Sequence, residues 1–267
     1  MKLTNSSTGG LDMADYNAME LMICAAARLL EDGSTAAVGT GAPVAAAVLA
    51  QKTHAPNLLI VFEAGGLAPL MPSMPISVGD SRSFYRALMA TSMNDIMETC
   101  QRGMMDYTFL SGAQIDPYGN LNSTVIGDYV KPRARLPGSG GADDLASFCW
   151  RIMVLMPHQR RRYVERLDFL TTPGYLSGPG AREAAGLPGG SGPYRVISDL
   201  AVMSFNNESK RMQVESLHPG VSFAQVQENT GFKILAAPGV RQTEPPEKEE
   251  LRILREEIDP LRYIIGR

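Results

Sequence analysis

The run NLLIVF at residues 57–62, followed at once by EAGG at residues 63–66, is the strongest indication of the fold. A continuous apolar run of this length predicts a strand that is covered on both faces, as in a parallel sheet. In open α/β sheets, ligands bind beyond the carboxyl ends of the strands, so Glu63 stands where chemistry usually occurs. Position alone does not decide between a catalytic and a structural role for Glu63, because ion-paired and helix-capping glutamates also follow strands.

Helices and strands alternate around this central strand. Asn17 and Glu20 have the spacing of a capping box, and Pro43 follows a glycine-rich turn, so each marks the start of a helix. The expected elements are helices over residues 17–31 and 44–52 and strands over residues 35–38 and 57–62. This alternation predicts an α/β fold with an open, mostly parallel sheet that is flanked by helices.

The second half of the chain adds strands that make the expected sheet mixed. The expected elements are a helix over residues 95–102, strands over 107–110 and 150–156, a hairpin of residues 195–205 and 211–217 around the turn 206–209, a short helix from Ser222 to Gly231, and a charged helix over 247–257. No internal repeat or linker separates them. We therefore expect a polar tail over residues 1–14 and a single domain over residues 15–267.

Composition excludes several classes of function. Hydrophobic residues make up 44% and charged residues 20% of the 267 residues, as in ordinary globular proteins. The net charge of −3 provides no broad positive field, which argues against nucleic-acid binding. The three cysteines are far apart and the histidines lack an HExxH spacing, so no disulfide or metal site is predicted. The polar N-terminus and the lack of long apolar runs predict a cytoplasmic protein without membrane contact.

Two further segments have the composition of ligand-binding loops. The run GSGGA at residues 138–142 leaves backbone N–H groups open to an anion, although a flexible surface loop would have the same composition. It is not a dinucleotide loop, because Asp143 stands where that pattern requires glycine. The run GAQIDPYGNLNST at residues 112–124 groups amides and hydroxyls around a turn, which ordinary turn chemistry also explains.

The three consecutive arginines at residues 160–162 are a third candidate. Guanidinium groups bind phosphate oxygens in a bidentate manner, so this run has the chemistry of a phosphate contact. A solvated surface turn is the better explanation of this run from sequence alone. The 15 methionines are assigned no chemistry, because methionine commonly serves as adaptable core.

Several motifs spread along the chain carry a family resemblance. They are residues 38–41 (VGTG), 77–80 (SVGD), 112–124, 126–129 (IGDY), 138–142, 177–180 (SGPG), 228–232 (ENTGF) and 255–260 (REEIDP). Together they resemble the β-type subunit of class I CoA-transferases, in particular glutaconate CoA-transferase, from about Asp15 to Ile258. In that family a glutamate after such a strand attacks the acyl-CoA thioester, and Glu63 occupies the matching position. The resemblance implies a covalent glutamyl-CoA intermediate.

The same resemblance implies the rest of the site. The backbone at Gly140, Gly141 and Ala142 would form the oxyanion hole. Acyl-CoA contacts would come from the side chains of Gln114, Asn120 and Asn122. Coenzyme A and a carboxylic acid would be substrates, no cofactor would be permanently bound, and an α-type subunit would complete a hetero-oligomer.

Other activities on the same fold remain open. Some relatives open rings by hydrolysis or decarboxylate, and they depart at the glutamate or at the GSGGA loop, both of which this sequence keeps. Residues 216–221 (SLHPGV) look like the ring-opening branch, and bulky residues over 67–74 leave the acid substrate undetermined. A non-catalytic structural subunit is the alternative of another class.

Overall fold

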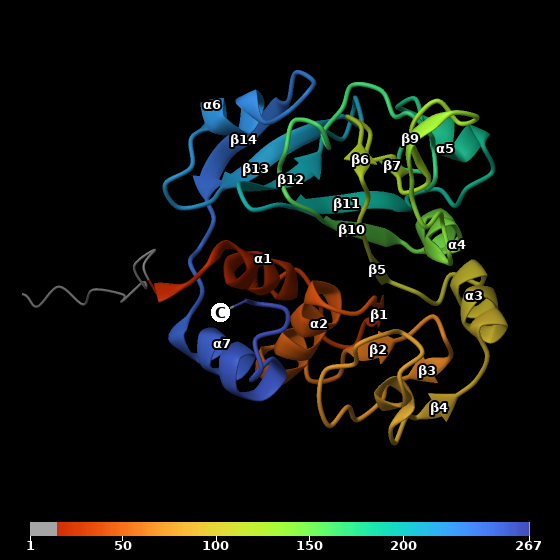
Figure 1. Cartoon of the computed structure of the whole chain (residues 1–267), viewed down its shortest axis with the longest axis vertical. Coiled ribbons are helices and arrows are strands. Elements are labelled where there is room, and N and C mark those ends of the chain that lie inside the picture. Colours follow the sequence, from red (N-terminus) through yellow and green to blue (C-terminus); the bar gives the residue numbers. More distant parts are fainter. Residues whose placement is uncertain (1–14, 267) are drawn as a thin grey trace, which may run out of the picture.

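Ten strands form one continuous sheet in the computed structural model, which describes residues 15–266 (Figure 1). In sheet order they are β14 (Leu235–Gln242), β13 (Met212–Leu217), β12 (Ala201–Phe205), β11 (Gly192–Ile197), β10 (Arg151–Leu155), β5 (Tyr107–Leu110), β1 (Thr35–Ala37), β2 (Leu59–Val61), β3 (Gly66–Leu67) and β4 (Met89–Ala90). The central strands from β11 to β2 run parallel, and antiparallel pairs lie on either side of them. The predicted mixed, mostly parallel sheet is confirmed.

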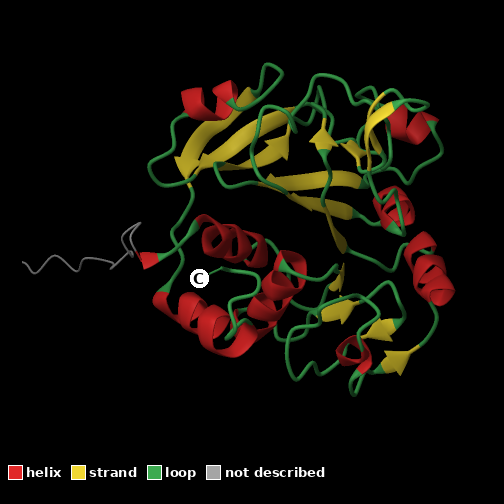
Figure 2. Cartoon of the chain, viewed as in Figure 1, coloured by secondary structure: helices red, strands yellow, loops and turns green. Residues whose placement is uncertain are grey.

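Helices flank this sheet, as Figure 2 shows. They are α1 (Ala18–Ala27), α2 (Ala42–Thr53), α3 (Met93–Gln101), α4 (Ala142–Phe148), α5 (Ala181–Ala184), α6 (Phe223–Glu228) and α7 (Lys248–Arg252), with a π-helical turn (Ile253–Ile258) after α7 and a 3-10 turn at Ser81–Phe84. Two small antiparallel ladders complete the fold, β6 (Gln114–Ile115) with β7 (Leu121–Asn122) and β8 (Val125–Gly127) with β9 (Pro132–Arg135).

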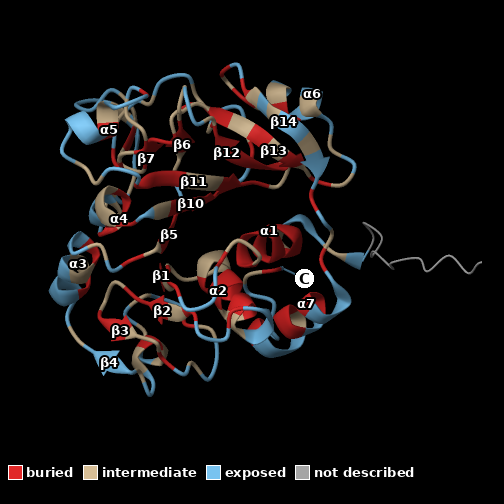
Figure 3. Ribbon diagram, turned by 180° about the vertical axis from the view of Figure 1, so that it is seen from behind, coloured by how far each residue is buried: buried red, intermediate tan, exposed pale blue. Residues whose placement is uncertain are grey.

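Alternate residues of the central strands face opposite layers of the core. Ile60 packs with α1, α2 and the π-helical turn, whereas its neighbour Val61 packs with α3 and α4 on the other face. Both side chains are fully buried, and burial of a side chain of this size contributes about 1.5–3 kcal/mol. Figure 3 shows how burial varies along the chain, with α1 and the central strands buried and β4 exposed at the sheet edge.

Local sequence signals explain where the helices begin. Asn17 forms the predicted capping box at the start of α1, and Pro43 lies in the first turn of α2. Ser222 forms a second capping box, at the start of α6. The predicted hairpin around residues 206–209 is confirmed by the antiparallel pair of β12 and β13, but its first strand was predicted too long, because residues 195–205 are not one strand. Ser198 accepts hydrogen bonds from Leu200 and Ala201, so the chain turns there and forms β11 and β12.

Two expectations about the chain ends and domains have no structural test. The polar tail predicted for residues 1–14 lies outside the described residues, and the single domain over 15–267 stays a prediction. Over residues 15–266, the helices are too short or too polar to cross a bilayer.

Candidate active site

Glu63 lies just beyond β2, at the carboxyl end of the parallel strands. A tight turn follows it, in which Gly65 donates to the carbonyl of Phe62 at 2.9 Å. Gly65 has φ +119°, and a Cβ there would lie 1.9 Å from the carbonyl oxygen of Thr91. Only glycine fits this turn, so the EAGG sequence fixes the position of the Glu63 backbone.

The GSGGA loop and Glu63 share one cavity of about 140 Å³. The cavity is lined by Ala37, Val38, Gly39, Glu63, Val78, Phe109, Leu110, Ser139, Gly140, Gly141, Ala142 and Leu145. A Cβ built on Gly141 would lie 2.6 Å from Oε2 of Glu63, so the carboxylate rests against the loop backbone. The half-buried Glu63 carboxylate has no hydrogen-bond or ion-pair partner among residues 15–266. A carboxylate without a partner is available as a nucleophile.

Two of the three predicted oxyanion-hole amides are open. Gly140 adopts φ +53°, and neither its N–H nor that of Gly141 donates to any acceptor in the described chain. The Ala142 amide, in contrast, donates to the carbonyl of Ser139 at 3.0 Å. Ala142 therefore lines the cavity with its methyl group, while the two glycine amides remain available for an anion.

A larger cavity of about 670 Å³ adjoins this site. Gly39, Val78, Phe109 and Leu110 line both cavities, and the larger one extends between α1 and the carboxyl ends of β5 and β10. Its other lining residues are Ala18, Met19, Met22, Thr40, Ala42, Pro43, Ser111, Leu155, Met156, Pro157 and Asp199. Such a mostly apolar hollow next to a polar site suits the neutral part of a ligand.

The structure does not bring Gln114, Asn120 and Asn122 to Glu63. Gln114 donates to Asp168 at 3.0 Å and accepts from Asn122 at 2.8 Å. Asn120 donates to the carbonyl of Leu176 at 2.8 Å and accepts from two backbone amides. All three are buried and hold the loops around β6 and β7, so their contact with acyl-CoA stays a prediction.

Several lining residues were missed because sequence does not show which strand ends are neighbours. Val38 and Gly39 follow β1, and Phe109 and Leu110 end β5, which pairs with β1. The bulky stretch over residues 67–74, expected near the acyl group, lines neither of the two cavities; Val78 does so instead.

Arg182 supports the loop from the far end of α4. Its fully buried guanidinium donates to the carbonyls of Ala146 and Ser147, which lie near the end of the helix that starts after Gly141. Burial lowers the pKa of Arg182. No motif marked this residue, because its partners lie far away in sequence.

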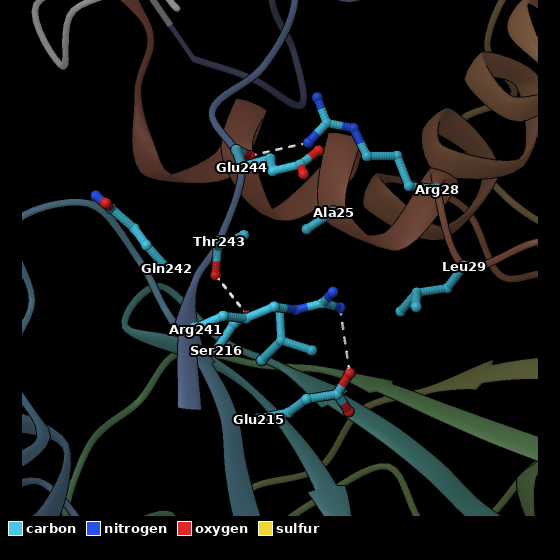
Figure 4. A pocket seen from close by; sticks show the side chains of 10 residues that line it. Ala25, Arg28, Leu29, Glu215, Ser216, Arg241, Gln242, Thr243 and Glu244 are labelled. Atoms are coloured by element: carbon cyan, nitrogen blue, oxygen red, sulfur yellow. Dashed lines mark hydrogen bonds and ion pairs between the residues drawn. The ribbon is translucent and has the colours of Figure 1, made fainter. Parts of the chain in front are cut away.

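A third cavity, of about 190 Å³, lies between α1 and the strands β13 and β14 (Figure 4). Arg28 donates to the carbonyl of Glu244 there, and Arg241 lies 3.4 Å from Glu215. Arg28 is also paired with Glu250 at 2.5 Å. Since these charges satisfy one another, this cavity is a weaker candidate for catalysis than the hollow at Glu63.

Comparison with known proteins identifies the family to which this chain belongs. The model for coenzyme A transferases matches residues 19–229. The B-type subunit of glutaconate CoA-transferase from Acidaminococcus fermentans is 36% identical over 93% of this chain and 95% of its own length. The crystal structure of that enzyme superposes with a TM-score of 0.90 at 35% identity, covering 96% of this chain and all of the matched one.

Two other relatives differ in their named activities. The B-type subunit of 3-oxoadipate CoA-transferase from Pseudomonas knackmussii is 39% identical over 91% of this chain and 94% of its own length. The cholesterol ring-cleaving hydrolase IpdB subunit of Mycobacterium bovis is 28% identical over 90% of this chain and 94% of its own. The two transferase subunits are thus more similar to this chain than the hydrolase subunit is.

Proposed function

Because this chain belongs to the coenzyme A transferase family, we propose that it moves coenzyme A between an acyl-CoA and a free carboxylic acid through a thioester on Glu63. The observation that carries the proposal is the unpartnered Glu63 carboxylate against the open amides of Gly140 and Gly141 in one cavity. Acyl transfer requires a nucleophile that attacks the substrate carbonyl and hydrogen-bond donors that stabilise the resulting oxyanion.

Each step uses these groups. A carboxylate oxygen of Glu63 attacks the thioester carbonyl, the C–S bond breaks, and CoA thiolate leaves behind a mixed anhydride. The thiolate then attacks the glutamyl carbonyl, which forms the glutamyl-CoA thioester and releases the first acid. A second acid reverses both steps. The negative charge that develops on each carbonyl oxygen would be stabilised by the two glycine amides.

The acid is a dicarboxylate in this proposal. Glutaconate and 3-oxoadipate, named for the two transferase relatives, both carry a second carboxylate. Since both relatives are B-type subunits, we expect this chain to pair with an A-type subunit and to be inactive alone. A closed interface would shield the anhydride from water, which a transferase needs more than a hydrolase does.

The test is isotope exchange by the two subunits expressed together. Labelled free acid is incubated with its unlabelled CoA ester over a panel of dicarboxylic and monocarboxylic acids, and label entering the ester is counted. Exchange that depends on Glu63 supports transfer. Release of free CoA without exchange would instead indicate hydrolysis, and release of carbon dioxide would indicate decarboxylation.

A further inference from the structure

A basic cavity of about 340 Å³ lies beyond the two cavities at the candidate active site. It is lined by Ala113, Gln114, Ile126, Arg133, Arg161 and Arg162. Half of these residues are arginines, although the whole chain has a net charge of −3. No carboxylate lines the cavity within the described chain, so the charged groups that line it are all positive.

Two of the three arginines of this cavity are held in place without being neutralised. Arg161 donates through Nε to Oε1 of Gln159 at 3.0 Å, and Arg162 donates through Nη1 to the carbonyl of Gly112 at 3.1 Å. Both acceptors are neutral. The nearby Asp168 does not line the cavity and accepts from Gln114 and Gly127 instead. The remaining N–H groups of these fixed guanidinium groups stay free for a bidentate ligand.

The three arginines that line the basic cavity form no ion pair with a carboxylate of the described chain. Among residues 15–266, carboxylates pair with Arg28 and Arg241 of the cavity in Figure 4, whereas none pairs with Arg133, Arg161 or Arg162. Three guanidinium groups that line one cavity without a carboxylate suit an external anion, most simply phosphate.

The Glu63 cavity, the large apolar cavity and the basic cavity follow one another along two chain segments. Leu110 lines the Glu63 cavity and the large apolar cavity, Ser111 lines the apolar cavity, and Ala113 lines the basic one. On the neighbouring segment Pro157 lines the apolar cavity and Arg161 the basic one. Along these segments the Glu63 carboxylate is therefore followed by the apolar cavity and then by the cluster of arginines.

This order matches the chemistry of coenzyme A, whose thiol is separated from its phosphates by a neutral pantetheine arm. Resting on the proposed function, we propose that Arg133, Arg161 and Arg162 bind the phosphates of the nucleotide end of coenzyme A, with the pantetheine arm in the apolar cavity. Arg161 and Arg162 of the arginine run thus serve as phosphate contacts.

Calorimetric titration of the co-expressed enzyme tests this site without turnover. The probes are coenzyme A, adenosine 3′,5′-bisphosphate as the nucleotide end, and pantetheine as the arm. Arg133→Ala and Arg161→Ala each raise the Kd for the two phosphorylated probes by about tenfold, because each removes charge-assisted hydrogen bonds. Pantetheine binding stays the same. Arg161→Lys, which keeps the charge, loses less affinity than Arg161→Ala.

The matched control is Arg166→Ala, which removes an unpaired exposed arginine of the same segment that does not line the cavity. It should bind all three probes like wild type. The site is overturned if the two alanine variants bind coenzyme A like wild type, or if they lose pantetheine to the same extent. Absence of label exchange together with arginine-dependent nucleotide binding would refute the transfer mechanism and leave this site standing.

Discussion

Gly141 and Glu63 approach so closely that a Cβ atom at position 141 would lie 2.6 Å from Oε2 of the glutamate. The carboxylate comes from the end of β2, and the glycine immediately precedes α4. Because residue 141 has no side chain, the Glu63 carboxylate can lie against the backbone of the loop.

Gly141→Ala should lower kcat by about 100-fold or more while KM changes little, because the new methyl group displaces the carboxylate and disturbs an oxyanion donor. The same Cβ would lie 2.6 Å from Cε of Met97, the end of a flexible side chain. Adding Met97→Ala should therefore not restore kcat. Gly189→Ala, where no atom lies within 4 Å of the new Cβ, is the control. Rescue by Met97→Ala would argue against displacement of Glu63.

Glu63→Gln should reduce exchange at least about a thousandfold, since the amide lacks the nucleophilic oxygen. Its melting temperature should equal that of wild type, because the carboxylate has no partner to lose in the described chain. Glu208→Gln, at an exposed turn, is the matched control for the change of charge. Steady-state exchange and circular dichroism give the two readouts. A Glu63→Gln enzyme with near wild-type exchange would rule out the mechanism.

Arg182→Met should destabilise the fold by at least about 3 kcal/mol, because several buried carbonyls lose their donor. These carbonyls are those of Ala146, Ser147, Pro173 and Gly174. Urea unfolding followed by circular dichroism measures the loss. Arg166→Met, at an exposed position, should change the free energy of unfolding by less than about 0.5 kcal/mol. Equal stability of the two variants would refute the structural role of Arg182.

Stability should fall on acidification because of His158. Burial lowers its pKa to about 4 from 6.5, and its ring stacks on Tyr163 with centroids 3.9 Å apart. In the unfolded chain His158 is therefore protonated below pH 6.5, whereas in the folded chain it is protonated only below about pH 4. The free energy of unfolding should drop by about 2 kcal/mol between about pH 7 and about pH 5 from this group. His158→Gln should flatten that dependence in urea titrations, and an unchanged slope would exclude His158 as its source.

The sequence predicted those parts of the fold that local physics determines. The apolar run at residues 57–62, the capping boxes at Asn17 and Ser222, and the glycine turn after Glu63 each depend on residues close in sequence. They placed the candidate nucleophile at the end of a strand. The two-residue strands β3 and β4 escaped prediction because they are too short for any periodic pattern.

The site itself depends on contacts that sequence does not show. Glu63 meets Gly141 because Leu145 of α4 packs with Val61 of β2, although the two residues are far apart in the chain. The resemblance implies that Gln114 and Asn122 contact acyl-CoA through their side-chain amides, but in the structure Asn122 donates to Gln114. A polar side chain in a turn-rich segment has several hydrogen-bond partners close in sequence, and only the folded structure shows which of them it binds.

Coenzyme A should become covalently attached to Glu63, and every step of the proposed transfer depends on that bond. The co-expressed enzyme would be mixed with acyl-CoA without acceptor acid, digested, and analysed by peptide mass spectrometry. We expect a coenzyme A adduct on the peptide that contains Glu63, absent from Glu63→Gln and removed when an acceptor acid is added. An enzyme that exchanges label while this peptide stays unmodified, or that carries the adduct on another residue, would disprove the proposed transfer.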